Sequence, residues 1–514
     1  MKHSFLRLLA IACILLCVWS CRPSPETSET SRPNILFIMT DDHSYQTMSL
    51  YDDRFIQTPN LDRIGREGVV FRNSFVSNSI CAPSRAVMLT GKHSHLNGQI
   101  NNFVRFDSSQ LSFPKLLQQT GYETAIVGKW HLKSEPTGFD HWEVLIGQGN
   151  YYNSDFIENG TKKPSEGYVT DVITDKGIQW LEQRNQERPF CLLVHHKATH
   201  RIWMPDTALF NEFAGKDFEV PDNFFDQYEG RTAAAAHVMG IDRDMDLVYD
   251  LKMLDPQGLL QTKYRKAYER MYGRMTAKQK AAWDAYYQPM IEAFLEAGLT
   301  GEELALWKYQ RYMQDYLACV RSVDNNVGRL LEYLDQEGLT ENTLLVYTSD
   351  QGFYMGEHGW FDKRFMYEES LRTPLVMRYP AGFSVAGDVS ELVQNIDYAP
   401  SILDFAQVPV PSEMQGRSLR PLLQKESTSW RESIYYHYYE FPNEHGTKKH
   451  YGIRTDRYKL IHFYEDIDEW EFYDLHNDPH EMNNLISKPD QQAIIQTLKR
   501  ELQQLRQEYQ VDVS

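Results

Sequence analysis

The sequence carries little positive charge for its length. Its 514 residues include 53 lysines and arginines against 71 aspartates and glutamates, which gives a formal net charge of -18. Proteins that bind DNA or RNA usually present a basic surface that neutralises phosphates. We therefore predict that nucleic acid is not a partner.

Cysteine is also scarce, with six in the chain. Three lie in or next to an apolar N-terminal run, and three lie beyond it: Cys81, Cys191 and Cys319. Such a sparse, odd-numbered set does not resemble the disulfide framework of an exported protein. Cys191 lies in an apolar run and Cys319 in a helical pattern, so we interpret both as buried residues.

The apolar run at the N-terminus is too short to span a bilayer well. Two basic residues precede residues 8–18, a pattern typical of an export signal over residues 1–20. Val18-Trp19-Ser20-Cys21 resembles a bacterial lipobox, in which cleavage before the cysteine precedes its lipidation. We therefore predict an exported bacterial protein, periplasmic or held by lipid at the outer membrane and cell surface. Simple secretion is the alternative, because Trp19 is bulky for such a cleavage site.

Short apolar runs separated by helical patterns predict an α/β fold. The runs cover residues 34–39, 124–127, 190–194, 343–347 and 374–378, and helical patterns such as 113–119 and 174–183 separate them. Strands buried on both faces read as continuous apolar runs and belong to sheets covered by helices. We therefore predict a large, mainly parallel mixed sheet flanked by helices.

Changes in composition predict the domain organisation. Residues 21–32 are rich in Ser, Thr, Pro and Glu and indicate a flexible tether. Residues 33–424 form the main domain, in which the helical patterns of residues 224–335 indicate an insertion or covering layer. Residues 425–514 alternate apolar and polar positions and end in a helical pattern. They predict a smaller C-terminal subdomain of antiparallel sheet plus helix.

Three predicted strands end in polar clusters, at residues 40–43, 128–131 and 349–352. Functional sites of α/β folds gather at the carboxyl ends of strands. Asp41, Asp42 and Asp350 offer carboxylates and Gln351 offers an amide oxygen, a set that suits Ca²⁺ or Mg²⁺ better than zinc. Taken alone, an Asp-Asp pair is more often a solvated turn or a helix cap, and this alternative stays open here.

Several protic or cationic residues accompany these clusters, and each has an ordinary structural interpretation when taken alone. A cap or ion pair would account for an arginine, and a hydrogen-bonded core position would account for a histidine. As a group they offer anion binding and proton transfer: Arg85, Lys129, His131, His200 and Lys363.

The segment Cys81-Ala82-Pro83-Ser84-Arg85, followed by Met88-Leu89-Thr90-Gly91, resembles the signature of formylglycine-dependent sulfatases of the alkaline-phosphatase superfamily. Further family blocks match in the family's order, at residues 121–122, 128–131, 349–352, 356–359, 374–375 and 451–455. Several ordered matches over roughly residues 33–490 are far more specific than one motif.

The resemblance implies that a formylglycine-generating or anaerobic sulfatase-maturating enzyme oxidises Cys81 to formylglycine (3-oxoalanine), and that residues 33–424 form the catalytic domain. It also implies a Ca²⁺ ion, with Mg²⁺ less favoured. The hydrated residue 81 completes the metal shell with the other implied ligands: Asp41, Asp42, Asp350 and Gln351. Gln351 stands where many relatives have Asn, which keeps the amide chemistry but changes its reach.

The resemblance further implies covalent catalysis, in which one hydroxyl of the hydrated formylglycine attacks sulfur and leaves a sulfo-enzyme. Arg85 and Lys129 would stabilise the hydrate, and His131 would be the base that releases sulfate. His200 and Lys363 would contact the sulfate and the leaving oxygen, with His200 as general acid. Thr199 precedes His200 where relatives often have Pro.

Residues 197–206, 222–235 and 439–461 most resemble the branch with N-acetylglucosamine-6-sulfatases and mucin-desulfating enzymes. This implies removal of the 6-O-sulfate of N-acetylglucosamine in glycosaminoglycan or mucin glycans. Asp362, His445 and His450 are candidate sugar contacts, although surface turns explain them equally well. The alternatives are a phosphodiesterase or phosphonate hydrolase of the same superfamily, a sulfatase for another sulfated sugar, and a glycan-binding lipoprotein without catalysis.

Overall fold

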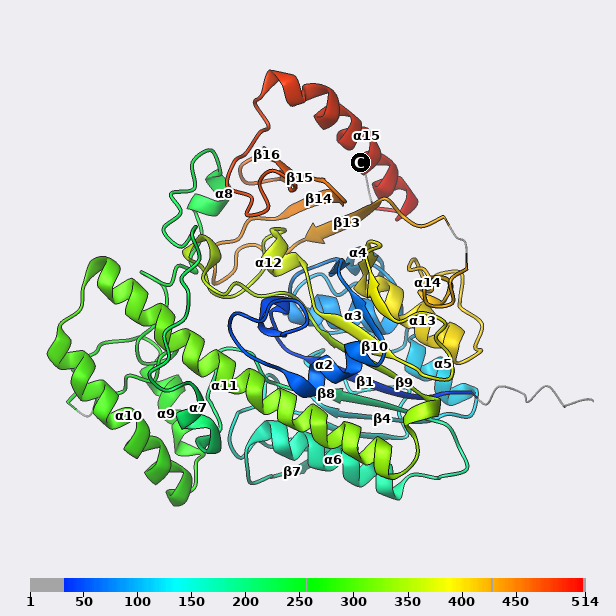
Figure 1. The fold of residues 1–514 in the computed structure, drawn as a ribbon, viewed down its shortest axis with the longest axis horizontal. Helices are drawn as coiled ribbons and strands as arrows, with labels where there is room; N and C mark the ends of the chain where they lie inside the picture. The colour runs from blue at the N-terminus through cyan, green and yellow to red at the C-terminus, as the bar shows by residue number, and fades with distance from the viewer. Residues whose placement is uncertain (1–31, 256, 427–428, 512–514) are drawn as a thin grey trace, which may run out of the picture.

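Figure 1 presents the computed structural model, which describes residues 32–255, 257–426 and 429–511. The predicted signal peptide and most of the predicted tether lie outside the described residues. The centre of the molecule is a ten-stranded mixed sheet. In sheet order its strands are β11 (Gly387–Val389), β2 (Val69–Phe71), β10 (Leu375–Arg378), β9 (Thr343–Ser349), β1 (Asn34–Thr40), β8 (Phe190–His195), β4 (Glu123–Gly128), β5 (His141–Leu145), β6 (Phe156–Glu158) and β7 (Thr161–Lys163).

The middle of this sheet is parallel. Strands β9, β1, β8, β4 and β5 run in one direction, whereas β10 and β6 join it antiparallel. All five runs predicted as strands are strands of this sheet, namely β1, β4, β8, β9 and β10. The predicted mainly parallel mixed sheet is therefore confirmed.

Each central strand is buried on both faces. In β1, Ile35, Phe37 and Met39 belong to one hydrophobic core, and Leu36 and Ile38 belong to the other. Because side chains alternate between the faces of a strand, a continuous apolar run is what burial on both sides requires.

Helices cover the two faces and supply the rest of these cores. On one face lie α2 (Pro59–Arg66), α6 (Val169–Gln183) and α11 (Gly301–Gln336), and on the other lie α3 (Cys81–Thr90), α5 (Phe113–Gln119) and α13 (Tyr398–Phe405). The predicted helical patterns at 113–119 and 174–183 correspond to α5 and to most of α6. Among the described residues, no helix combines the length and apolar character needed to cross a membrane.

The region predicted as a helical insertion contains α8 (Thr232–Ala235), α9 (Arg265–Gly273), α10 (Ala277–Ala297) and most of α11. Helices α9 and α10 gather with α7 (Phe210–Phe213) to one side of the sheet in Figure 1. Helix α11 begins in that group, runs across the sheet and contacts α6 and α2. The last part of the region therefore covers the sheet, and the proposed domain boundaries stay predictions.

The C-terminal part is a four-stranded antiparallel sheet, as predicted. Its strands are β13 (Ser433–Tyr438), β14 (His450–Thr455), β15 (Tyr458–Phe463) and β16 (Glu469–Asp474), in that order. Helix α15 (Gln492–Glu508) packs Ile495, Leu498 and Leu502 against Ile453 and Leu460 of the sheet. The remaining short strands and α-helices of the described residues are β3 (Ser74–Phe75), β12 (Val393–Gln394), α4 (Ser94–Asn97), α12 (Glu368–Leu371) and α14 (Arg420–Leu423).

A buried glutamate of this C-terminal sheet makes stability depend on pH. Burial raises the pKa of Glu471 to about 7, although the hydroxyls of Tyr367 and Tyr473 each donate a 2.8 Å hydrogen bond to it. The folded protein therefore prefers Glu471 in its protonated form. The contribution of this group to stability is complete below its pKa in the unfolded chain, about 4.5, and is lost as the pH rises through its pKa in the folded protein, about 7. At about 1.4 kcal/mol per pKa unit, the loss is about 3 kcal/mol.

We expect Glu471→Gln to remove this loss. Between about pH 5 and about pH 8, the free energy of unfolding of the variant should fall by about 2–3 kcal/mol less than that of wild type in urea titrations. Glu469→Gln, on the same strand with a partly exposed side chain, is the matched control. Equal pH dependence in all three proteins would contradict the assignment.

Candidate active site at the carboxyl ends of the strands

The carboxyl ends of β1, β4, β8 and β9 meet at one edge of the sheet because these strands are parallel. Backbone hydrogen bonds join the loops there, from Thr199 N to Asp41 O at 2.7 Å and from Asp350 N to Thr40 O at 3.1 Å. The loops carry most of the candidate residues: Asp41 and Asp42 after β1, Lys129 and His131 after β4, His200 after β8, and Asp350 and Gln351 after β9.

Several of these residues have a left-handed backbone conformation. The φ angle is 68° at Asp42, 59° at His131 and 79° at Asp362. Side chains other than glycine's rarely adopt this conformation, and residues held in it cluster at functional sites, where the surrounding structure compensates for the strain. The loops at this edge are therefore held in conformations that their sequences alone would not favour.

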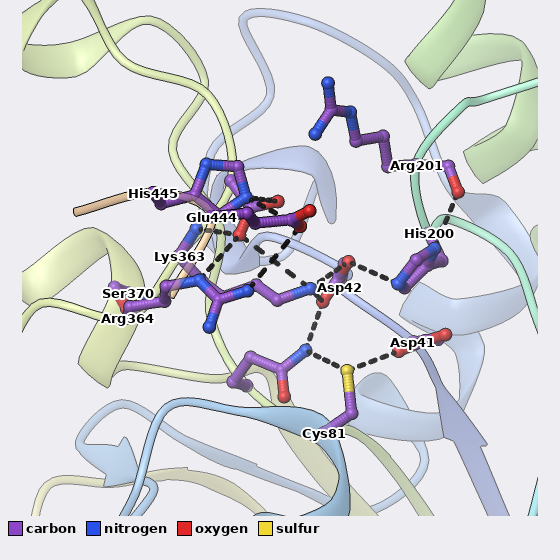
Figure 2. Close-up of polar contacts among 12 residues, drawn as sticks. Asp41, Asp42, Cys81, His200, Arg201, Lys363, Arg364, Ser370, Glu444 and His445 are labelled. Atoms are coloured by element: carbon purple, nitrogen blue, oxygen red, sulfur yellow. Dashed lines mark hydrogen bonds and ion pairs between the residues drawn. The ribbon is translucent and has the colours of Figure 1, made fainter. Parts of the chain in front are cut away.

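Cys81 is the first residue of α3 and is 1% exposed. Its Sγ donates a 3.4 Å hydrogen bond to Asp41 Oδ1, as Figure 2 shows. It also accepts a longer contact of 3.8 Å from Gln351 Nε2. Burial raises the pKa of the thiol, so the unmodified residue stays protonated. Asn102 Oδ1 accepts a 3.0 Å hydrogen bond from Ala82 N, which satisfies one of the unpaired backbone N–H groups in the first turn of this helix.

Arg85 and Lys129 form buried ion pairs with the acids of the site. Arg85 lies one helical turn after Cys81, and its Nε is 2.8 Å from Asp350 Oδ2. Its Nη1 also donates to the backbone oxygen of Lys129 at 2.8 Å, while Lys129 Nζ pairs with Asp41. Burial would raise the pKa of Asp41, but Lys129 and the other nearby cations hold it well below its usual value. Asp41 is therefore ionised.

Lys363 and His200 approach Asp42 from two sides (Figure 2). Lys363 Nζ is 2.7 Å and 2.6 Å from the two carboxylate oxygens of Asp42. His200 Nε2 is 4.0 Å from Asp42 Oδ2, and its Nδ1 is 2.6 Å from the backbone oxygen of Arg201. Burial lowers the pKa of His200, so the ring is neutral and its Nδ1 donates to that oxygen.

His131 lies at the same edge of the sheet and keeps a free proton acceptor. Its Nδ1 is buried and makes no hydrogen bond with the described residues. Burial and the charge of Lys129 lower the pKa of the imidazole well below its usual value. The ring is therefore neutral, which is the state that a general base requires.

Of the three candidate sugar contacts, the structure brings two together. His445 Nε2 is 3.3 Å from Asp362 Oδ2 and 3.2 Å from Glu444 Oε1, and Asp362 precedes Lys363 in the chain. His450 is fully buried in β14, where its ring stacks with Phe365, Tyr436 and Tyr438. The structure therefore does not bring His450 to the site, because an aromatic core encloses it.

Sequence reasoning missed two cations beside the site. Lys197 is 4% exposed, and burial lowers its pKa to about 8. Its Nζ lies 4.9 Å from the centre of the Tyr151 ring and forms no ion pair with the described residues. Arg364 follows Lys363 and donates from Nη1 to Glu440 Oε1 at 3.0 Å. The position of Lys197 two residues after a buried strand was the available signal.

The arrangement of the acids fits a hard cation. One carboxylate oxygen from each of Asp41, Asp42 and Asp350 lies within 4.8 Å of the others, and all three residues are fully buried. Gln351 Oε1, beside them, is buried and accepts no hydrogen bond from the described residues. Three oxygen donors and an unused amide oxygen match the ligands that Ca²⁺ and Mg²⁺ prefer.

A bound dication would also change the charge of the site. The three acids face three cations in ion pairs of 4.0 Å or less: Arg85, Lys129 and Lys363. These charges balance, so a dication would leave a net positive site. A net positive, buried site attracts anionic groups although the whole protein is acidic.

Comparisons with known proteins agree with this geometry. The family described as Sulfatase matches residues 33–408, which is more than half of the chain. The chain belongs to the sulfatase family. A second family, described as N-sulphoglucosamine sulphohydrolase, C-terminal, matches residues 356–508 of this sulfatase. Sulfatases of this superfamily generally use formylglycine and a divalent metal.

Among the relatives, an N-acetylglucosamine-6-O-sulfatase of Bacteroides thetaiotaomicron is 50% identical and covers 95% of this sulfatase and 88% of its own length. A solved structure of a protein in complex with its substrate D-glucosamine-2-N,6-O-disulfate superposes with a TM-score of 0.91 at 49% identity. It covers 94% of this chain and 99% of its own. A multifunctional alkaline phosphatase superfamily protein of Trinickia caryophylli is 27% identical over 86% of this chain and 88% of its own.

Proposed function

We propose that this sulfatase removes the 6-O-sulfate from N-acetylglucosamine or a related glucosamine at the end of glycosaminoglycan or mucin glycans. The observation that carries the choice of sugar is the 50% identity, over 95% of the chain, to an N-acetylglucosamine-6-O-sulfatase. The solved relative bound to a 6-O-sulfated glucosamine supports the same choice.

In this proposal residue 81 is formylglycine, and Cys81 Sγ marks the place of its hydrate oxygens. One oxygen attacks the sulfur, the bond from sulfur to the sugar oxygen breaks, and the sulfate stays on residue 81. A Ca²⁺ ion held by Asp41, Asp42, Asp350 and Gln351 would polarise the sulfate when bound.

The chain's own residues supply the protons and the opposing charges. Arg85 and Lys129 stabilise negative charge at residue 81, and Lys363 and Lys197 face the sulfate. A sulfate beside His200 raises the pKa of that imidazole, so it can carry a second proton and pass it to the leaving sugar oxygen. His131 then takes the proton of the second hydroxyl, the carbon–oxygen bond to sulfate breaks, and the aldehyde returns.

A cavity beyond Asp362 supports the position of the sugar. It encloses about 390 Å³ and is lined in part by Arg201, Phe361, Glu444 and His445. Figure 2 shows Arg201 and His445 on the side of Asp42 that faces away from Cys81. Most of the residues that line it are polar or charged, and such groups can fix the orientation of a ligand that carries several hydroxyls. We propose that Asp362 and His445 accept and donate hydrogen bonds to sugar hydroxyls.

A panel of substrates tests the proposal. We expect protein co-expressed with a maturation enzyme to release sulfate from N-acetylglucosamine 6-sulfate at least about 100-fold faster than from 3-O- or 4-O-sulfated isomers. Ion chromatography measures the sulfate. Equal rates on all isomers, or no release from the 6-sulfate, would overturn the choice of sugar.

The same assay tests the rival reaction. Some proteins of the superfamily are multifunctional, as the description of the Trinickia caryophylli relative states. The panel therefore includes a phosphodiester and a phosphonate monoester. A higher kcat/KM for either than for every sulfate ester would favour the rival function.

Maturation and export complete the proposal. We propose that a formylglycine-generating or anaerobic sulfatase-maturating enzyme modifies Cys81 in the cell. Export with lipid on Cys21 stays a prediction, because residues 1–31 lie outside the described residues.

A further inference from the structure

An exposed aromatic side chain lies close to the N-terminus of α3, which we call the nucleophile helix because it begins with Cys81. Phe103 is 68% exposed, which is the highest value among the large hydrophobic side chains of the described residues. Exposed apolar surface is unfavourable in water by roughly 25 cal/mol per Å², so a ligand that covers the flat face of this ring gains that free energy.

The loop that presents Phe103 is fixed rather than loose. Asn101 Oδ1 accepts hydrogen bonds from the backbone N–H groups of Phe103 and Val104, at 2.8 Å and 2.9 Å. Gln99, which is fully buried, donates from Nε2 to the backbone oxygens of Asn101 and Val104 at 2.8 Å and 3.0 Å. The ring therefore reaches solvent from a loop whose backbone is hydrogen-bonded at several points.

The same loop is attached to both sides of the active site. Asn102 Oδ1 accepts from Ala82 N, next to the nucleophile, at 3.0 Å. Asn102 N donates to Glu440 Oε2 at 3.0 Å, and the other oxygen of Glu440 pairs with Arg364, two residues after Asp362. Phe103 thus follows directly after a residue that connects the nucleophile helix to the proposed sugar-binding segment.

A lysine stands over this ring. Lys133 Nζ lies 5.6 Å from the ring centre and donates to the backbone oxygen of Phe103 at 3.0 Å. Its side chain is exposed, and it forms no ion pair with the described residues. Lys133 comes two residues after His131, so the proposed general base and this lysine share one loop.

We infer that Phe103 and Lys133 form a subsite for the sugar linked to the sulfated residue, and that this neighbouring sugar carries a carboxylate or a sulfate. The inference rests on the proposed function. The apolar C–H face of a pyranose covers an aromatic ring while its hydroxyls stay in water. The lysine ammonium then attracts the anionic group, so the pair favours an acidic glycosaminoglycan over a neutral glycan.

The test compares three substrates that share a terminal 6-O-sulfated N-acetylglucosamine: the monosaccharide, a disaccharide with a uronate neighbour, and a disaccharide with galactose. For Phe103→Ala we expect the ratio of kcat/KM for the uronate disaccharide to that for the monosaccharide to fall about 10-fold. Lys133→Met keeps an apolar side chain of similar length but removes the charge. For this variant we expect the ratio of kcat/KM for the uronate disaccharide to that for the galactose disaccharide to fall about 3-fold at low salt, and by a smaller factor at high salt.

Leu259→Ala is the matched control. Leu259, in the predicted helical insertion, is a hydrophobic residue of comparable exposure, with 61% of its surface accessible. Its loss should leave both ratios at their wild-type values. If neither ratio changes in the Phe103 and Lys133 variants while wild type cleaves all three substrates, the subsite is wrong and the proposed function stands. If wild type cleaves none of them, the proposed function fails and the subsite fails with it.

Discussion

Cys81→Ala is expected to lower the rate of sulfate release by about 10⁴-fold or more, which is the scale of loss when a covalent nucleophile is removed. Alanine cannot become formylglycine, so the attacking oxygen is absent while the acids and cations around it remain. Cys81 Sγ makes two weak polar contacts, to Asp41 at 3.4 Å and to Gln351 at 3.8 Å, so its removal breaks no strong hydrogen bond and should cost only the stability lost to a small cavity. Sulfate release and thermal unfolding are measured on the same preparation.

Cys191→Ala is the matched control for this experiment. Cys191 is as buried as Cys81 but lies in β8, on the face that packs against Phe37 and other core residues. We expect it to lose stability from the cavity and to keep its turnover. Mass spectrometry of the peptide around residue 81 reports conversion to the aldehyde in both active proteins. Wild-type turnover by Cys81→Ala would sink the mechanism.

The second large effect concerns the metal. We expect removal of Ca²⁺ by a chelator, and separately Asp350→Asn, to lower sulfate release by about 100-fold or more. The carboxylate of Asp350 both belongs to the three-acid group and pairs with Arg85 at 2.8 Å, so its loss removes a ligand and frees a buried cation. Added Ca²⁺ should restore the chelated wild type better than Mg²⁺ and should not restore the variant.

Loss of a buried ion pair is itself destabilising by about 3–5 kcal/mol, so the control must share that loss. Asp315→Asn serves, because Asp315 is buried and pairs with Lys252 at 2.9 Å and Arg311 at 2.5 Å away from the three-acid group. It should unfold more easily yet bind one equivalent of calcium by elemental analysis. If Asp350→Asn also retains the calcium and the wild-type rate, the proposed metal site is incorrect.

Some features of the site were predictable because they depend on local pattern. A strand buried on both faces needs a continuous apolar run, so β1, β4, β8 and β9 were visible in the sequence. Parallel strands end at one edge, so Asp41, Asp42 and Asp350 could be expected to meet. The motif at Cys81 then connected this edge to one family.

Other features depend on contacts between distant segments and left no reliable mark in the sequence. His445 and His450 lie five positions apart with equal prior claims, yet His445 pairs with Asp362 while Phe365 and Tyr436 enclose His450. Lys197 differs from a surface lysine only through its burial. These outcomes depend on which neighbour each side chain meets, and that follows from packing.

The class of this protein and the position of its nucleophile could be predicted from the residues alone, because apolar periodicity and an ordered set of motifs are local properties of the chain. Tertiary structure decided the rest. It balanced three buried acids with three cations, and it brought His445 from the C-terminal sheet to Asp362. It also placed Phe103 in solvent one residue after Asn102, which accepts a hydrogen bond from the first turn of the nucleophile helix. Charge balance, pairing and exposure are properties of neighbours in space, and residues hundreds of positions apart become neighbours only in the folded chain.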